Sequence, residues 1–543
     1  MKDFRRETVY QIYPKSFNDS NGDGIGDIKG ITEKLDYIES LGAGLVWLTP
    51  FYSSPQNDNG YDVADYCSVD PIYGTMEDVD ELIAEAGKRG IGLMLDMVFN
   101  HTSTEHEWFR KALSGDEKYQ KYYIFRDGTP DTPPTNWISK FGGSAWEWAP
   151  EVGKWYLHLF DRTQADLNWD NPEVRKELQD VLLFWKEKGI RAFRFDVVNL
   201  ISKPAVFEDD NEGDGRRFYT DGPHIHEYLK EMVKATGLTD SVTVGEMSST
   251  NLSDCVRYSN PDERELSMCF SFHHLKTDYQ DGDKWRLGSN DLDELKRLLS
   301  SWQEGMQDGN GWNALFWCNH DQPRIVSRMG SEGRYYRESA KALATCIHLM
   351  RGTPYVYQGE ELGMMNAHYP SISCYRDVES LNYYRIMLEE GRSEEEAIEV
   401  LTSRSRDNAR TPMQWNRSLN MGFTTGTSWL SIPDNPKEIN AEDETSDEAS
   451  VLSHYRKLIK LRKDLDVVAE GSIKFLPSPY GVMLYERRYR NQVLKVAVNL
   501  LSKDAGLDVK LEGDPVISSY DDFPMEGTDK LRPFEAVAYL SRL

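Results

Sequence analysis

The sequence contains few cysteines and no long apolar run. Its 543 residues include six cysteines, which are widely spaced and form no CxxC pair. This spacing favours free thiols in a reducing compartment over disulfides or a zinc site. No stretch of about 18 residues is apolar and uncharged, and residues 1–14 lack the apolar centre of a signal peptide. We therefore expect a cytoplasmic protein that neither spans nor binds a membrane.

Basic residues are scarce relative to acidic ones. The sequence has 63 Lys and Arg against 90 Asp and Glu, which gives a formal net charge of -27. Such a balance argues against nucleic acid or an anionic membrane surface as a partner. The length and a hydrophobic content of 39% are sufficient for two or three domains. A small-molecule partner remains, and we expect a monomer or a weak homo-oligomer.

Short apolar runs alternate with amphipathic stretches over most of the chain. Eight runs have the composition of strands: 8–13, 44–48, 92–98, 192–195, 242–245, 266–272, 312–317 and 354–357. Amphipathic stretches such as 77–88, 174–188 and 292–302 lie between them. This alternation is typical of βα units, and eight units predict an α/β fold, a closed (β/α)8 TIM barrel.

Two regions depart from the βα pattern. Residues 102 to about 163 are rich in Trp, Tyr, Pro and Gly and predict a loop-rich domain inserted after the third strand. After the eighth strand, 371–432 has the composition of loops and one helix, 434–450 of an acidic linker and 453–463 of a closing helix. The remainder alternates as an antiparallel β-sandwich does. The predicted domains are 1–101 with 166–465 (barrel), 102–165 (inserted) and 466–543 (C-terminal).

Three predicted strands end in a carboxylate. Arg194 and Asp196 are two residues apart, so on a strand they face the same side, where the guanidinium would lower the pKa of the aspartate. Glu246 and Asp321 end the runs VTVGE and WCNHD. In a parallel barrel these ends converge, and crowded carboxylates separate into a proton donor and an ionised group, as glycoside hydrolysis requires. A structural ion pair is the alternative for Arg194 and Asp196.

One loop after the first strand carries oxygen ligands at alternate positions. The residues concerned are Asp19, Asn21, Asp23, Ile25 and Asp27. The spacing is similar to the first nine positions of an EF-hand loop, although the twelfth position is a glycine where a bidentate Glu belongs. The loop therefore predicts either a structural Ca²⁺ or Mg²⁺ site or a plain turn. No cofactor is expected for the chemistry.

The strand-end motifs AFRFD, VGE, NHD and DMVFNH strongly resemble the four signature regions of the α-amylase family (glycoside hydrolase family 13). QADLN at 164–168 and NARTPMQW at 408–415 extend the resemblance to its oligo-1,6-glucosidase-like branch. The resemblance implies a retaining α-glycosidase in which Asp196 is the nucleophile, Glu246 the acid/base and Asp321 the stabiliser of the transition state. A retaining pair of carboxyl groups lies about 5–5.5 Å apart.

The same resemblance implies a blind pocket that holds the non-reducing glucose, and hence an exo-acting enzyme. The residues that it assigns to this pocket are Tyr61, Asp62, His101, Phe141, Arg194, His320 and Arg410. For Tyr61 the alternative is ordinary burial, and a lone histidine is more often a packing residue than a functional one. His101 and His320 both follow predicted strands, which favours contact with sugar hydroxyls.

The run LSMCFSFHHLK at 266–276 is similar to the phosphotrehalase branch of the family, which hydrolyses trehalose 6-phosphate. An acidic protein repels a phosphorylated sugar, so a basic pocket is needed. The candidate phosphate ligands are His273, His274, Lys276, Lys284 and Arg216. The alternative is a strand end with a solvated lysine and a packed histidine.

Two rival functions remain. Val197, directly after the predicted nucleophile, also occurs in α-1,6-acting members, so an oligo-1,6-glucosidase or a sucrose-acting relative is possible on the motifs alone. A non-catalytic family member, such as a transporter-associated subunit, is the rival from another class. The intact acids Asp196, Glu246 and Asp321 argue against it.

Overall fold

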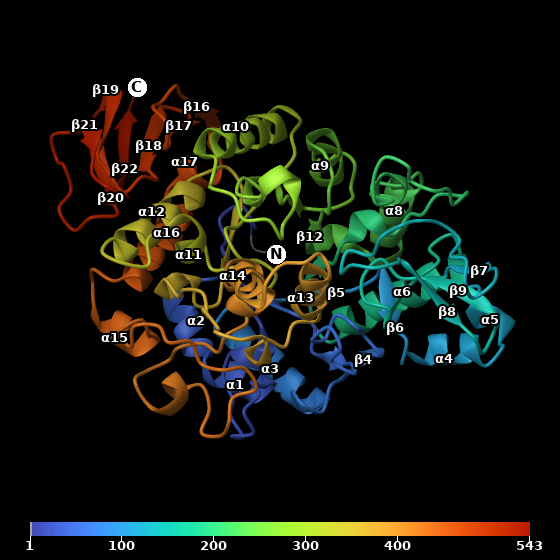
Figure 1. Ribbon diagram of the computed structural model, residues 1–543. Coiled ribbons are helices and arrows are strands. Elements are labelled where there is room, and N and C mark those ends of the chain that lie inside the picture. Colours follow the sequence, from blue (N-terminus) through green and yellow to red (C-terminus); the bar gives the residue numbers. More distant parts are fainter. Residues whose placement is uncertain (1–2, 543) are drawn as a thin grey trace.

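Eight parallel strands form a barrel in the computed structural model, which describes residues 3–542 (Figure 1). The strand order is β13-β12-β11-β5-β2-β1-β15-β14, and a parallel bridge between Cys269 and Asn313 joins the two end strands. The strands are β1 (Val9–Ile12), β2 (Leu45–Leu48), β5 (Gly92–Met97), β11 (Ala192–Phe195), β12 (Val242–Glu246), β13 (Met268–Phe270), β14 (Ala314–Leu315) and β15 (Thr353–Tyr357). The predicted barrel is confirmed, with each strand within its predicted run or one residue beyond it.

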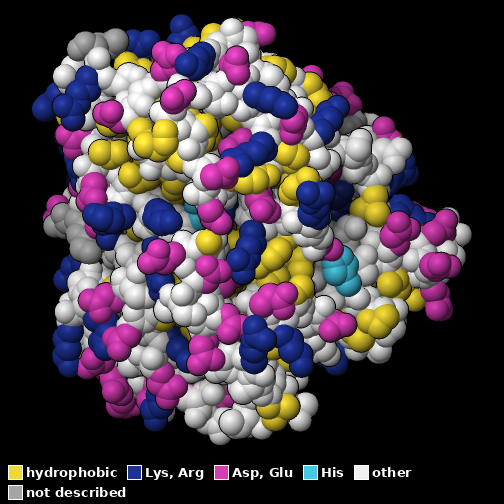
Figure 2. All heavy atoms as spheres, turned by 90° about the vertical axis from the view of Figure 1, so that its left-hand side faces the viewer, with side chains coloured by type: hydrophobic (Ala, Val, Ile, Leu, Met, Phe, Trp, Pro, Cys, Tyr) yellow, Lys and Arg dark blue, Asp and Glu magenta, His cyan; other side chains and the backbone are white. Residues whose placement is uncertain are grey.

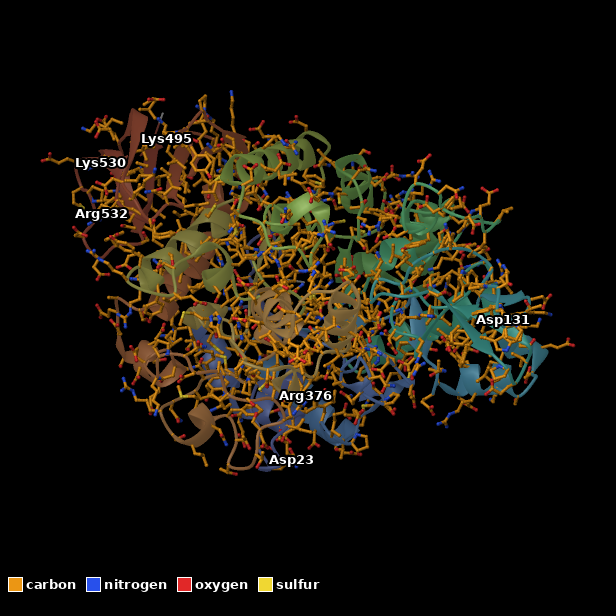
Figure 3. All side chains as sticks on the ribbon, in the orientation of Figure 1. Asp23, Asp131, Arg376, Lys495, Lys530 and Arg532 are labelled. Carbon is orange, nitrogen blue, oxygen red and sulfur yellow. The ribbon has the colours of Figure 1, made fainter. Side chains whose placement is uncertain are left out.

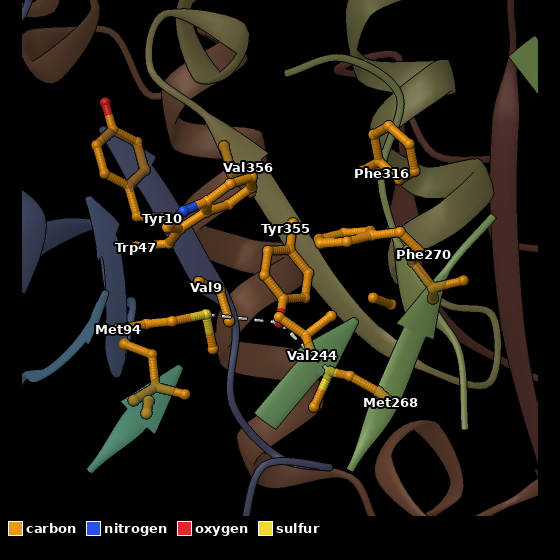
Figure 4. Close-up of a cluster of buried hydrophobic side chains, with 14 of the residues drawn as sticks. Val9, Tyr10, Trp47, Met94, Val244, Met268, Phe270, Phe316, Tyr355 and Val356 are labelled. Atoms are coloured by element: carbon orange, nitrogen blue, oxygen red, sulfur yellow. Dashed lines mark hydrogen bonds between the residues drawn. The ribbon is translucent and has the colours of Figure 1, made fainter. Parts of the chain in front are cut away.

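Large apolar side chains fill the barrel. Figure 4 shows Trp47, Met94, Phe270 and Tyr355 directed toward one another from four strands. The Tyr355 hydroxyl lies 3.4 Å from the sulfur of Met268, and the ring lies edge-on to Phe270. Burial of aromatic and aliphatic side chains of this size contributes about 1.5–3 kcal/mol each, so the interior is a packed core. The chemistry must therefore occur at the strand ends.

Helices surround the barrel, and their starts follow from local sequence. At α3, Thr75 and Asp78 form a capping box, and at α6 Asn171 caps a helix whose first residue is Pro172. The helices of the barrel are α1 (Ile28–Glu33), α2 (Leu35–Leu41), α3 (Met76–Lys88), α6 (Pro172–Glu187), α7 (Arg216–Tyr219), α8 (Ile225–Thr236), α9 (Leu252–Ser259), α10 (Leu292–Asp308), α11 (Ile325–Met329) and α12 (Tyr336–His348).

Between β5 and β11 the chain leaves the barrel and forms a small separate sheet, seen in cyan in Figure 1. Its strands are β7 (Phe125–Asp127), β8 (Trp146–Ala149) and β9 (Lys154–Leu157), with α4 (Glu107–Leu113) and α5 (Glu117–Gln120) beside them. The two connections to the barrel pair with each other as β6 (His101–Ser103) and β10 (Gln164–Asp166). Trp137 and Trp146 of this region share a core with Val197, the residue after Asp196. The inserted region thus packs directly on the strand end that carries the predicted nucleophile.

The region after β15 contains more helix than the sequence predicts. Instead of one helix in 371–432 there are two, α13 (Val378–Glu389) and α14 (Glu394–Arg404). The acidic start of α14 resembles a loop in composition, but Ser393 and Glu396 form a capping box that starts a helix there. The predicted linker at 434–450 also contains a helix, α15 (Ala441–Ser446), which Asn440 caps.

The predicted closing helix is α16 (Val451–Asp464), followed by α17 (Asp466–Ala469) and an antiparallel module. Its five-stranded sheet has the order β16-β17-β18-β22-β20, and β19 pairs with β21. The strands are β16 (Ser472–Phe475), β17 (Val482–Tyr489), β18 (Gln492–Asn499), β19 (Ala505–Leu511), β20 (Asp514–Ser518), β21 (Thr528–Leu531) and β22 (Ala536–Arg542). Leu511 and Leu531 of the β19–β21 pair share a core with Val482 and Val537 of the larger sheet. This packing of two sheets gives the C-terminal sandwich predicted from the alternating pattern.

On the face shown in Figure 2, acidic and basic side chains are interspersed. All six cysteines are free thiols, and four of them are buried. No helix within residues 3–542 is long and apolar enough to cross a membrane.

Candidate functional site

Three carboxylates meet at the C-terminal end of the barrel. Asp196 follows β11, Glu246 ends β12 and Asp321 lies six residues after β14, and all three line one cavity of about 240 Å³. The side chains of Asp196 and Glu246 are 9% and 11% exposed, whereas the side chain of Asp321 is 30% exposed. A molecule that enters the cavity from solvent can therefore reach the carboxylates, Asp321 most readily.

Arg194 links the two buried carboxylates. Its Nη1 donates to Asp196 Oδ1 and to Asp96 Oδ1, both at 2.6 Å, and its Nη2 contacts Glu246 Oε2. Arg194 itself is 1% exposed. Strand register explains the arrangement, because Arg194 lies directly beside Asp96 on β5 and Val244 on β12. A single buried cation therefore fixes the positions of the residues predicted to attack and to protonate.

The electrostatics differ from the expectation that Arg194 would lower the pKa of Asp196. Burial raises the pKa of Asp196 to about 6, because the loss of solvation outweighs the attraction of Arg194 and Asp96 adds repulsion. Burial raises the pKa of Glu246 further, to about 8, and the negative charges of Asp196 and Asp321 add to the effect. Near pH 7 the site therefore holds an ionised Asp196 beside a protonated Glu246, the division of roles that acid/base and nucleophile require.

Asp321 is held ionised. Although burial acts to raise its pKa, His320 and the guanidinium groups of Arg406 and Arg410 hold it far below its usual range. Arg410 donates to Asp321 Oδ1 at 2.7 Å, and His320 Nε2 lies 3.3 Å from Oδ2. Burial lowers the pKa of His320 to about 3, and Gln11 donates to its Nδ1. His320 is therefore a neutral ring that directs its Nε2–H toward Asp321.

Aromatic rings form the walls of the cavity. Tyr61 stacks on His320 with ring centroids 5.0 Å apart and an angle of 3° between the planes, and its hydroxyl donates to Asp96 at 2.8 Å. His101 and Phe160 lie on another wall with centroids 5.2 Å apart. Phe141 of the inserted region also lines the cavity, and the guanidinium of Arg406 lies over its ring. Flat apolar rings beside hydrogen-bonding groups suit a pyranose ring.

Comparison with known proteins identifies the family. The family model for "Alpha amylase, catalytic domain" matches residues 11–471. The chain is 52% identical to the trehalose-6-phosphate hydrolase of Bacillus subtilis, over 99% of this chain and 98% of that protein. It is 45% identical to the oligo-1,6-glucosidase of Parageobacillus thermoglucosidasius, over 99% of each. The crystal structure of Bacillus licheniformis trehalose-6-phosphate hydrolase superimposes with a TM-score of 0.94 at 54% identity, covering 99% of this chain and 100% of that one.

The chain belongs to the α-amylase family.

Within this α-amylase-family site, Asp58 replaces Asp62 as the pocket residue. Asp62 is fully buried behind the wall and accepts hydrogen bonds from Ser54 and from the backbone of Asn57 and Asp58. Its carboxylate organises the loop and does not line the cavity. Asp58 does line it, four residues earlier in the same motif. The sequence could not separate them, because which aspartate faces the cavity depends on how the loop turns.

A second replacement concerns the arginines of the NARTPMQW region. Arg406 lines the cavity, donating to Asp58 Oδ1 at 2.9 Å and lying 3.3 Å from Asp321 Oδ1. The predicted Arg410 is fully buried and reaches Asp321 from behind the cavity wall. Of the other predicted sugar ligands, Tyr61, His101 and Phe141 line the cavity. Arg194 and His320 do not line it, but they contact the lining residues Asp196 and Asp321.

Of the five predicted phosphate ligands, two lie in the cavity. Lys276 and Lys284 line it, but Lys284 already donates to Glu379 at 2.7 Å. Arg216 is bound by both oxygens of Asp214, at 2.8 and 2.9 Å from its Nε, outside the lining. Lys276 is thus the predicted ligand whose ammonium group lines the cavity without a hydrogen-bonding or ion-pair partner among residues 3–542.

His273 and His274 point elsewhere. His273 stacks on Trp302 with centroids 4.4 Å apart, and His274 shares a hydrogen bond of 2.9 Å with the carbonyl of Phe316. Burial lowers the pKa of both histidines to about 4, so at neutral pH neither carries a positive charge. Both lie beside a separate small cavity. The sequence motif places them next to Lys276, but the 3-10 turn at His273–Leu275 directs them away from it.

The predicted metal loop lies at the surface, where Figure 3 labels Asp23 at the edge of the molecule. Its oxygens suit a hard cation, but they are engaged within the protein. Asp19 accepts from the backbone of Asn21, Gly22 and Gly24, and Asp27 accepts from Gly30 as the cap of α1. In the part of the chain that the structure describes, no three His, Cys, Asp or Glu side chains are gathered to hold a metal. The metal site stays a prediction.

Proposed function

We propose that this protein hydrolyses trehalose 6-phosphate to glucose and glucose 6-phosphate with retention at the anomeric carbon. The observation that carries the proposal is the free ammonium group of Lys276 in the same cavity as the acid/base Glu246. A protein of net charge -27 repels a phosphorylated sugar unless the site itself supplies positive charge. The 52% identity to a trehalose-6-phosphate hydrolase over almost the whole chain supports it.

In the first step, a carboxylate oxygen of Asp196 attacks the anomeric carbon of the non-reducing glucose as the glycosidic C–O bond breaks. Glu246 transfers its proton to the departing oxygen, so glucose 6-phosphate leaves as an alcohol. Positive charge develops on the ring between Asp196 and Asp321, and the ionised Asp321 stabilises it. A glucosyl ester on Asp196 results.

In the second step, Glu246 as a carboxylate takes a proton from a water molecule whose oxygen attacks the anomeric carbon. The ester bond to Asp196 breaks, glucose leaves and Glu246 is again protonated. Arg194 contacts both acids. It can therefore stabilise the negative charge on Asp196 before the first step and on Glu246 after it. No cofactor takes part in either step.

The second candidate is an oligo-1,6-glucosidase, which the 45% identity to such an enzyme favours. The same catalytic groups would serve it, and the leaving sugar would carry no phosphate. The two functions differ in the part of the site that binds the leaving sugar. An unphosphorylated leaving sugar needs no lysine without a counter-ion there.

The proposed substrate also fits a cytoplasmic enzyme, because a dianionic sugar phosphate does not cross a bilayer unaided. We propose a small-molecule substrate as the partner, and a monomer or a weak homo-oligomer as the state in solution.

The test compares kcat/KM for trehalose 6-phosphate, trehalose and isomaltose, in the wild type and in Lys276→Ala. We expect trehalose 6-phosphate to be preferred by orders of magnitude and the substitution to narrow the preference, because a charge-assisted hydrogen bond is lost. If kcat/KM were highest for isomaltose and unchanged in Lys276→Ala, the oligo-1,6-glucosidase would replace the proposal.

A further inference from the structure

Lys140 is a second lysine in the cavity, and it comes from the inserted region rather than from the barrel. It directly precedes Phe141 in the sequence, lines the same cavity, and donates from its Nζ to Ser248 Oγ at 3.2 Å. Ser248 is two residues after Glu246. Lys140 therefore joins the inserted region to the acid/base loop, on the side of the cavity where the leaving group must lie.

The charges around the cavity are unevenly balanced. Lys284 is paired with Glu379, and Arg406 with Asp58. Lys140 and Lys276 have no carboxylate within 4.0 Å in the described chain, residues 3–542. An ammonium group has three donors. Lys140 uses one of them on Ser248, and its Nζ also lies over the ring of Tyr219, 5.7 Å from the centroid. No hydrogen bond to a carboxylate of residues 3–542 occupies the remaining donors, which leaves them for a ligand.

We propose that Lys140 and Lys276 together bind the phosphate of the leaving group, and that Lys140 is a specificity-determining residue for phosphorylated substrates. The inference rests on the proposed function and extends it, because it assigns part of the phosphate recognition to the inserted region. Two lysines from segments more than a hundred residues apart can hold an anion between them, which a single exposed lysine holds only weakly.

The electrostatics of the cavity support this assignment. Burial lowers the pKa of Lys140 to about 8, an effect that Arg216 and Lys276 strengthen and that Asp214 and Glu246 oppose, and burial with Arg216 lowers the pKa of Lys276. Lys140 and Lys276 repel one another and neither contacts a carboxylate of residues 3–542, so both are stabilised when a dianion lies between them. A neutral sugar would not relieve this repulsion.

Both ends of the Lys140 contact are held in place. The Lys140 backbone N–H donates to Leu159 O at 2.9 Å, and Ser139 Oγ donates to Phe160 O at 2.6 Å. On the other side, Asn199 exchanges two hydrogen bonds of 2.9 Å with the backbone of Ser248. Binding the phosphate therefore requires little reordering of the loops, which preserves affinity.

The experiment measures kcat/KM for trehalose 6-phosphate and for trehalose in the wild type, Lys140→Met, Lys140→Arg and a control. The control is Lys121→Met, an exposed lysine of the same inserted region. We expect the ratio of the two kcat/KM values to fall about 10- to 100-fold in Lys140→Met. Lys140→Arg should recover most of it, because the charge returns, and Lys121→Met should leave the ratio unchanged. Inhibition by glucose 6-phosphate should weaken in Lys140→Met by a similar factor.

An equal loss on both substrates in Lys140→Met would overturn the inference, since it would mean that the lysine only positions Ser248 and the acid/base loop. An unchanged ratio would overturn it as well. Failure of the proposed function looks different, because the wild type itself would then show no preference for trehalose 6-phosphate. Thermal melting of each variant separates a folding defect from these outcomes, and glucose 6-phosphate inhibition reads out binding without turnover.

Discussion

Arg194 Nη1 on β11 lies 2.6 Å from Oδ1 of Asp196, which directly follows the strand two residues later. The contact does not make Asp196 a strong acid, since burial dominates and its pKa is about 6. Its value is geometric, because the same guanidinium contacts Glu246 and thereby sets the position of one carboxyl group relative to the other. The predictions below follow from this pair and its surroundings.

Replacing the nucleophile should abolish turnover while the protein stays folded. We expect Asp196→Asn to lower kcat on the order of 10⁴-fold or more, because the amide cannot form the glucosyl ester. Melting temperature should change little, since the amide can still accept a hydrogen bond from Arg194. Steady-state kinetics on an aryl α-glucoside, with melting curves as the control, makes the test; wild-type activity in this variant would remove Asp196 from the mechanism.

The pH dependence of kcat/KM should be bell-shaped. Asp196 must be ionised, so activity should fall below about pH 6, and Glu246 must be protonated, so activity should fall above about pH 8. An uncharged aryl α-glucoside should be used, because phosphate itself titrates near pH 6. In Glu246→Gln the alkaline limb should disappear, and a limb that persists unchanged would assign it to another group.

Asp58 and Asp62 should respond differently to substitution although they share one motif. Asp58→Asn should lower kcat/KM about 10- to 100-fold for every α-glucoside, because a charged hydrogen-bond acceptor in the cavity is lost. Asp62→Ala should instead cost about 2–4 kcal/mol of unfolding free energy, since three donors lose their acceptor. Denaturant titration and kinetics on both variants test the contrast, which would be refuted if Asp62→Ala were as stable as the wild type.

Stability should decline as the pH rises above about 5, in part because of Glu444. This buried side chain accepts a hydrogen bond from Leu452 N, and burial raises its pKa from the ordinary 4.5 to about 8. The folded protein keeps a proton that the unfolded chain loses between these values, so the contribution of Glu444, on the order of a few kcal/mol, is present below pH 4.5 and lost toward pH 8. Unfolding free energies at pH 5, 6.5 and 8 should depend less on pH in Glu444→Gln. An equal slope in both proteins would contradict the assignment.

The loop at 19–27 allows a direct test for a structural metal. If Ca²⁺ or Mg²⁺ binds there, a chelator should lower the melting temperature by several degrees and added metal should restore it. Asp23→Asn should melt near the chelated value, while kcat stays close to that of the wild type because the loop lies at the surface. A melting temperature that changes with neither chelator nor metal would favour a turn that binds no metal.

Much of this protein can be predicted from its sequence, for local reasons. Short apolar runs predict the eight barrel strands, and amphipathic stretches predict helices such as α3, α6, α10 and α16, since each pattern depends on residues a few positions apart. The three acids could be placed in one site because parallel strands of a barrel share one end. Arg194 could be paired with Asp196 because the two share one face of a strand. The α14 start was missed because a capping box among acidic residues has the composition of a loop.

What the tertiary structure decided depends on contacts between distant segments. Asp58 rather than Asp62, and Arg406 rather than Arg410, line the cavity because loop conformation, not spacing, determines which of two similar side chains faces inward. Lys140 donates a hydrogen bond to Ser248, 108 positions away in the sequence, and no sequence motif predicts such a contact. The pKa values of Asp196 and Glu246 likewise follow from burial, which exists only once the chain has folded around them. The sequence determines by itself the barrel and its chemistry; the folded structure determines which substrate that chemistry can reach.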